Sequence, residues 1–185
     1  MHKLLVLFAA ALLIAGCEGD TGPTGPAGNA NVMAGTISPT NAEWICCSNW
    51  KMTTDVGTVT AITTRYVDIP VAEITADIIA NGAVLMYFEA ETGSARWAPL
   101  PFELLHYTRA YFINVVYEVQ EGMIRLHYFL MSAIPGVTPP DPATVVIPTY
   151  HFKYLVIEGT ALLTLQAGGI DLSEPDRIIE YATRP

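Results

Sequence analysis

Residues 111–131 read YFINVVYEVQEGMIRLHYFLM. Apolar and polar residues alternate in both halves of this stretch, which is the period of a β-strand with one face in a core. The halves meet at Gln120-Glu121-Gly122, a turn signal, so the stretch predicts an antiparallel hairpin. The side chains predicted to face the core are Tyr111, Ile113, Val115, Tyr117 and Val119 in the first strand and Ile124, Leu126, Tyr128 and Leu130 in the second. Those predicted to face away are Asn114, Glu118, Arg125 and His127.

Further short runs of β-branched and aromatic residues lie on both sides of this hairpin, separated by Gly, Pro and Asn. We predict strands at residues 31–37, 58–67, 83–89, 144–147 and 151–157. Many short strands at this spacing favour an all-β fold over parallel β-α units. The expected fold is an antiparallel β-sandwich, jelly-roll-like, that forms one head domain over residues 32–185.

Two short helices interrupt the strand pattern, one in the middle and one at the C-terminal end. Over residues 74–82, Thr75 can cap the start and Asn81-Gly82 can close the end. Over residues 174–182, Ser173 followed by Asp176 resembles a capping-box start. Residues 134–142 contain four prolines and predict a surface loop.

The first sixteen residues follow the order of a secretion signal, with Lys3 ahead of an apolar run over residues 4–14. A membrane-spanning helix needs ~20 apolar residues, so this run predicts export and not a span. The run ends in Ile14-Ala15-Gly16-Cys17, which resembles the bacterial lipobox. That resemblance implies cleavage before Cys17 and lipid attachment to its thiol. The alternative is an ordinary signal peptide with a chance cysteine.

Residues 17–31 carry glycine at every third position from Gly19 to Gly28, with Pro23 and Pro26 in the second place. This is the collagen triplet, in which only glycine fits on the axis of the triple helix. Four triplets suit an extended tether of roughly 35 Å, at ~3 Å per residue. The alternative is a homotrimer, in which the head brings three chains together and the triplets wind beneath it.

The chain is acidic and about half apolar. Loss of Lys3 with the signal leaves eight Lys and Arg against eighteen Asp and Glu, a formal charge of −10. Negative charge repels phosphate backbones and anionic headgroups, so the composition argues against nucleic-acid binding. The apolar half is enough to bury one sizeable core.

Cys46 and Cys47 are the two cysteines that remain after lipidation of Cys17. In an oxidising compartment, three interpretations of this pair are open. The two cysteines could form a vicinal disulfide in a redox-sensitive or ligand-touching loop, or they could form bridges between subunits. They could also be two thiols tucked beside Trp44 and Trp50. Adjacent Cα atoms lie closer together than in ordinary disulfides, so the first alternative needs an unusual geometry.

Trp44 and Trp50 are the candidate ligand-contacting aromatics, because exposed rings beside the loops of a sandwich can bind sugars or proteins. The alternative is that these rings lie in the core or at its rim. Trp97 is expected to be structural. No two of the histidines have local metal-ligand spacing, so we expect no metal site and a solvated His127. Glu89 and Glu91 can mimic paired acids, but no catalytic motif is present, so we expect no catalytic residue, no enzyme activity and no cofactor.

The order of four motifs resembles small collagen-triplet lipoproteins of Bacteroidetes-type bacteria: triplets that run into Asn29-Ala30-Asn31-Val32, then residues 74–85, 97–102 and 152–157. The resemblance covers nearly the whole mature chain. It implies a β-sandwich on a lipid tether and implies no catalytic residue. The adjacent cysteines Cys46 and Cys47 depart from the pattern of this family.

From these features we expect a lipid-anchored outer-membrane protein of a Gram-negative cell envelope. Its head would be a non-enzymatic interaction or structural module with a protein or glycan partner. The alternative is a carbohydrate- or ligand-binding accessory lipoprotein that uses exposed aromatics.

Overall fold

A computed structural model describes residues 31–53 and 56–183. These residues form two antiparallel β-sheets with a few short helices, so the predicted all-β sandwich is confirmed. The predicted signal segment, Cys17 and the glycine triplets lie outside the described residues.

The five-stranded sheet has the order β2 (Ile45–Thr53), β3 (Val59–Pro70), β8 (Met123–Ser132), β7 (Tyr111–Gln120) and β6 (Phe102–Leu105). Its centre is the predicted hairpin, in which Val115 pairs with Tyr128 and Val119 with Ile124. The predicted inward face is confirmed, since Val115, Ile124 and Tyr128 are at most 2% exposed.

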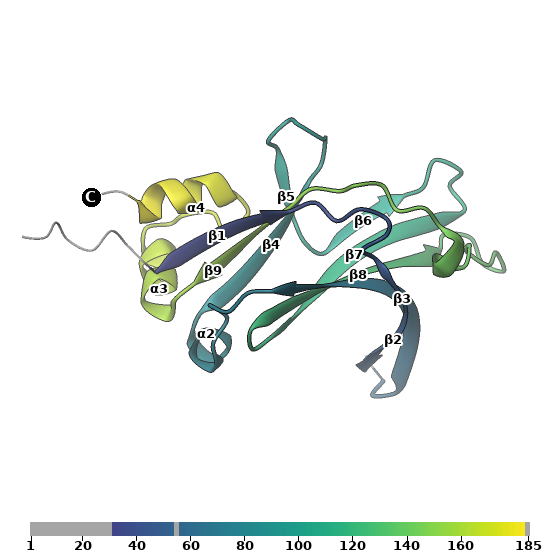
Figure 1. Cartoon of the computed structure of the whole chain (residues 1–185), viewed down its shortest axis with the longest axis horizontal. Coiled ribbons are helices and arrows are strands. Elements are labelled where there is room, and N and C mark those ends of the chain that lie inside the picture. The colour runs from purple at the N-terminus through teal and green to yellow at the C-terminus, as the bar shows by residue number, and fades with distance from the viewer. Residues whose placement is uncertain (1–30, 54–55, 184–185) are drawn as a thin grey trace, which may run out of the picture.

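The four-stranded sheet has the order β1 (Val32–Ile37), β9 (Phe152–Ile157), β4 (Ala83–Glu89) and β5 (Trp97–Pro99). Both of its faces are covered. One face packs on the other sheet, through buried residues that include Met86, Phe88 and Phe152. The opposite face packs Tyr87, Leu155 and Ile157 against helices α3 (Gly159–Ala167) and α4 (Pro175–Ala182) (Figure 1). The molecule therefore has three layers at its helical end.

The helix predictions are partly correct. Helix α2 (Ala76–Asn81) begins as predicted, with the Thr75 side chain accepting the backbone N–H of Ile78. The predicted Ser173 cap of α4 is wrong: Glu174 is the N-cap residue and makes no side-chain cap bond, because Pro175 already sets the backbone of the first turn. Helix α3 was not predicted.

The predicted strand at residues 144–147 is wrong. The Asp141 side chain accepts the backbone N–H of Ala143 and caps a single 3₁₀ turn, η1 (Pro142–Thr144). Three strands were also missed, namely β2, β5 and β6. The loop prediction for residues 134–142 holds as far as residue 141.

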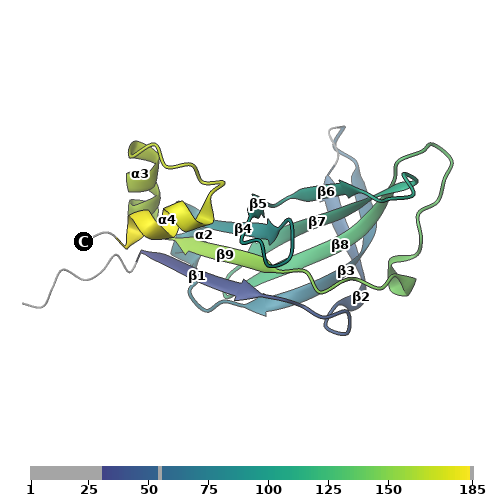
Figure 2. The ribbon, with the colours of Figure 1, turned by 90° about the horizontal axis from the view of Figure 1, so that it is seen from above.

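Figure 2 shows the elongated shape that results. Strand β1 begins beside α3 and α4, at one end of the molecule, whereas the β2–β3 hairpin and the loop before η1 lie toward the other end. Within the described residues, no helix has the length and apolar character of a membrane span.

Candidate functional site

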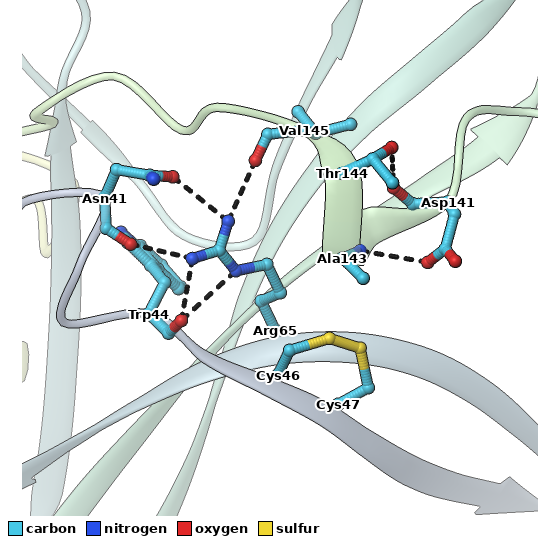
Figure 3. The surroundings of a disulfide bond; sticks show 9 residues. All are labelled: Asn41, Trp44, Cys46, Cys47, Arg65, Asp141, Ala143, Thr144 and Val145. Carbon is cyan, nitrogen blue, oxygen red and sulfur yellow. Dashed lines mark hydrogen bonds between the residues drawn. A yellow bond between two sulfur atoms is a disulfide. The ribbon is translucent and has the colours of Figure 1, made fainter.

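Cys46 and Cys47 lie at the start of β2, an edge strand of the five-stranded sheet. The register of β2 on β3 shifts between Ile45 and Ser48, so both cysteines oppose the single residue Arg65. This two-against-one pairing is a β-bulge. The two sulfur atoms are bonded to each other, and both residues are exposed (Figure 3). A vicinal disulfide thus lies on an accessible edge, and a redox or ligand-touching role for it stays a prediction.

Arg65 is a buried charge opposite this bulge, with an exposed fraction of 7%. Its guanidinium donates to the backbone oxygens of Trp44, Asn41 and Val145 and to the side-chain oxygen of Asn41, at 2.7–3.2 Å (Figure 3). A buried cation is tolerated only when its donors are paired. Arg65 therefore fastens the β1–β2 connection and the segment after η1 to strand β3.

Trp44 is buried and not an exposed ring beside a loop, since its side chain is only 2% exposed. Its ring packs edge-on against Tyr128, with the centroids 6.0 Å apart. The reason is long-range: Arg65 binds the Trp44 carbonyl and holds this residue against the core.

Trp50 lies on the outer face of the five-stranded sheet and is half-buried. Its ring stacks on His127 with the centroids 5.1 Å apart, and its indole N–H donates to Glu118. Part of the ring is accessible, but its polar atom already has an acceptor.

His127 is 1% exposed, so the prediction of a solvated ring is wrong. Its side chain is on the predicted face, but Trp50 covers it there. Nδ1 lies 2.9 Å from the Thr64 hydroxyl, and Nε2 lies 3.2 Å from a Glu118 carboxylate oxygen. Burial lowers the pKa of His127 below its ordinary value, and the bond to Glu118 opposes that shift only in part. The ring is therefore held neutral at pH 7.

A pocket that the sequence did not predict lies at one end of the four-stranded sheet. Ile37 and Phe88 pair with Phe152 from either side. One row further along the sheet, His151 therefore lies between Ser38 and Glu89. Glu89 in turn pairs with Trp97. Side chains in one row share a face. Four residues from four chain segments therefore lie side by side.

This row lines a cavity of about 340 Å³. Ser38 Oγ lies 3.0 Å from His151 Nδ1. Glu89 is 8% exposed, and its carboxylate accepts the backbone N–H of Ala95 at 2.9 Å. Bonds from the backbone of Ala95 and Gly93 hold the pKa of Glu89 below its ordinary value. Glu89 is therefore a fixed, ionised acceptor at neutral pH.

Trp97 forms one side of the same cavity. The Lys153 ammonium lies 4.5 Å from the centroid of its ring and is paired with Asp176 of α4 at 2.5 Å. The indole Nε1 of Trp97 is buried and has no acceptor among the described residues. Trp97 is thus fixed from one side, with its polar atom unsatisfied.

Glu89 and Glu91 do not share a site as paired acids. The Glu91 carboxylate is exposed and binds Arg96, whereas that of Glu89 is held by the Ala95 backbone. Within residues 31–53 and 56–183, no three His, Cys, Asp or Glu side chains are grouped so as to hold a metal ion.

Comparison with known proteins found no matching family, no matching curated sequence and no matching solved structure. The fold and the site therefore define the class of this chain only as an all-β sandwich with a vicinal disulfide and a small polar pocket. The resemblance to collagen-triplet lipoproteins stays a prediction.

Proposed function

We propose that this chain is a lipid-anchored envelope protein of a Gram-negative bacterium that displays its sandwich as a non-enzymatic interaction module. One observation carries the proposal. Strand β1 begins at Val32, directly after the triplets, at the helical end of an elongated molecule (Figure 2). A lipid on Cys17 would therefore hold that end toward the membrane and leave the rest of the head for partners.

The charge of the chain supports this orientation. The mature chain carries an excess of acidic residues, and acidic surfaces are repelled by anionic headgroups. A head of this charge gains nothing from lying on the bilayer, so a tether that lifts it off the lipid is consistent with display.

Lipid attachment can be tested by growth with an alkyne-bearing palmitate analogue, followed by detection of the label on the purified chain. We expect label on the unaltered chain and none on Cys17→Ser. The matched control is the double variant Cys46→Ser and Cys47→Ser, which removes the other two cysteines and should keep the label. Label that persists on Cys17→Ser would contradict an anchor at this residue.

The predicted homotrimer is part of the same proposal, since three heads would bring three sets of triplets together. It is tested by the native mass of the piece from Gly19 onward. Three chains per particle at micromolar concentration would support the trimer, and a clean monomer would exclude it.

The second candidate function is ligand binding through exposed aromatics. The burial of Trp44 removes one of the two predicted residues, and Trp50 is half-buried. The cavity beside Trp97 favours this function instead, because it combines an aromatic ring with several polar groups in one hollow.

A further inference from the structure

The cavity beside Trp97 lies on the helix-covered face of the four-stranded sheet, just past the edge of the helical cover. Leu155 and Ile157 of β9 carry α3 and α4 on this face, and Lys153 and His151 continue the same alternation beyond the helices. The row of four neighbouring segments is ~14 Å wide, from ~4.8 Å per strand. The cavity is therefore a hollow across one end of the four-stranded sheet.

The polar groups of this hollow suit a ligand rich in hydroxyl groups. The lining residues include Thr36, Ser38 and Thr92, each of which has a hydroxyl group. Ser38 engages only Nδ1 of His151, and no hydrogen bond of the second ring nitrogen is seen within the described part of the chain. The carboxylate of Glu89 adds a charged acceptor. Donors and acceptors are thus both available within one small space.

Charge selects against the other classes of small ligand. An anion would meet the ionised Glu89, which is repulsive. A cation would compete with the backbone N–H of Ala95 for that carboxylate and would lie beside Lys153. An apolar ligand would cut the carboxylate off from water without replacing its hydrogen bonds, which is costly.

We propose that Ser38, Glu89, Trp97 and His151 form a binding site for a neutral saccharide, such as the terminal sugar of a glycan. The proposal rests on the proposed function, because it names the ligand class of the displayed head. Glu89 accepts from sugar hydroxyls, His151 and Ser38 exchange hydrogen bonds with them, and Trp97 offers its apolar ring as a wall.

The test uses the full mature chain in a detergent without a sugar headgroup. The chain is first applied to a printed array of neutral, uronic-acid and sialylated glycans. Calorimetric titration with the methyl glycoside of the strongest neutral hit follows. We expect Glu89→Gln to weaken this binding about ten- to a hundredfold, the usual cost of a lost charge-assisted hydrogen bond. Trp97→Ala should weaken it by about tenfold or more, through lost ring contact.

Two matched controls lie outside the hollow. Glu103→Gln alters an exposed acid of β6, and Tyr107→Ala removes a ring that is 88% exposed in the β6–β7 turn. Both should leave the affinity unchanged. A measurement on the unaltered chain avoids any folding defect: the Trp97 indole N–H resonance, assigned by its loss in Trp97→Phe, should change its chemical shift when the glycoside binds, because Trp97 lines the hollow.

The proposal fails if no neutral glycan binds, if only acidic glycans bind, or if Glu89→Gln and Trp97→Ala bind as tightly as the unaltered chain. Palmitate labelling of the same preparation keeps the two proposals apart. A labelled chain that binds no sugar overturns the saccharide site alone, whereas an unlabelled chain overturns the anchor.

Discussion

At the scale of single residues, Arg65 is a buried side chain that holds backbone segments in place through its hydrogen bonds. Its guanidinium is shared by the oxygens of Asn41, Trp44 and Val145, which come from two distant loops. Methionine at this position would keep most of the volume and remove the Arg65 donors from the backbone oxygens of Asn41, Trp44 and Val145, whereas the Asn41 side-chain oxygen would keep the backbone N–H of Ile147. Each unsatisfied buried group costs about 1–3 kcal/mol.

We therefore expect Arg65→Met to lower the free energy of unfolding in urea by about 3 kcal/mol or more. The matched control is Arg125→Met, because Arg125 pairs with Asp68 near the surface and such pairs contribute about 1 kcal/mol or less. Equal losses for the two variants would show that the Arg65 network does not hold the loops.

His127 predicts a dependence of stability on pH. Its pKa is lowered in the folded chain from the ordinary value of 6.5. At a pH below 6.5, His127 is therefore protonated to a greater extent in the unfolded chain than in the folded chain. The contribution of His127 to stability is thus complete above pH 6.5 and falls as the pH drops below that value.

This effect is measured by urea unfolding at a series of pH values between 7.5 and about 5, a range set by the ordinary pKa of histidine. In His127→Gln the decline below pH 6.5 should be shallower than in the unaltered chain. His106→Gln, in the β6–β7 turn, serves as the control and should keep the full decline. An unchanged profile in His127→Gln would refute the buried neutral ring.

The disulfide makes a chemical prediction at the same scale. Because Cys46 and Cys47 are bonded to each other, a thiol-alkylating reagent should add nothing to the unfolded, unreduced piece from Gly19 onward, and two groups after reduction. Intact mass gives the count. Two groups added without reductant would exclude the bridge.

At the scale of elements, a helix or strand could be predicted where its own residues carry a clear local pattern, and was missed where they do not. The β7–β8 hairpin could be predicted because its alternation and its turn are local. Helix α3 could not, because its residues are apolar on several sides and its N-cap residue, Glu158, makes no capping bond. Strand β2 was missed because its bulged start resembles a turn and most of its side chains are exposed.

The candidate site was hidden for a similar reason. Ser38, Glu89, Trp97 and His151 are spread over more than a hundred positions, and only the pairing of β1, β9, β4 and β5 makes them neighbours. Trp44 was misjudged because its burial depends on Arg65, twenty-one positions away. Contacts of this range leave no periodic signal in the sequence.

Two leucines of helix α3 can test whether this helix packs on the four-stranded sheet. Leu165 is 1% exposed and packs with Tyr87 and Ile178, whereas Leu163 is 67% exposed. Leu165→Ala should cost about 2–5 kcal/mol of unfolding free energy, through lost burial and the cavity left behind. Leu163→Ala should change it by about 0.5 kcal/mol or less. Comparable losses in the two variants would mean that α3 does not pack on the sheet as described.

At the scale of the whole molecule, the head is elongated and its N-terminal strand begins at one end. The head presents helices and the start of β1 at one end and the β2–β3 hairpin at the other (Figure 1). The proposed saccharide site lies between these ends, at the Ile37 end of β1. A tether at the helical end would thus leave this hollow clear of the membrane.

The most direct test of the account is the intact mass of the chain extracted from the cell envelope with detergent. The account predicts a chain that begins at Cys17 and carries the added mass of a diacylglyceryl group. A water-soluble chain with a free thiol at Cys17, or one that still carries residues 1–16, would contradict it.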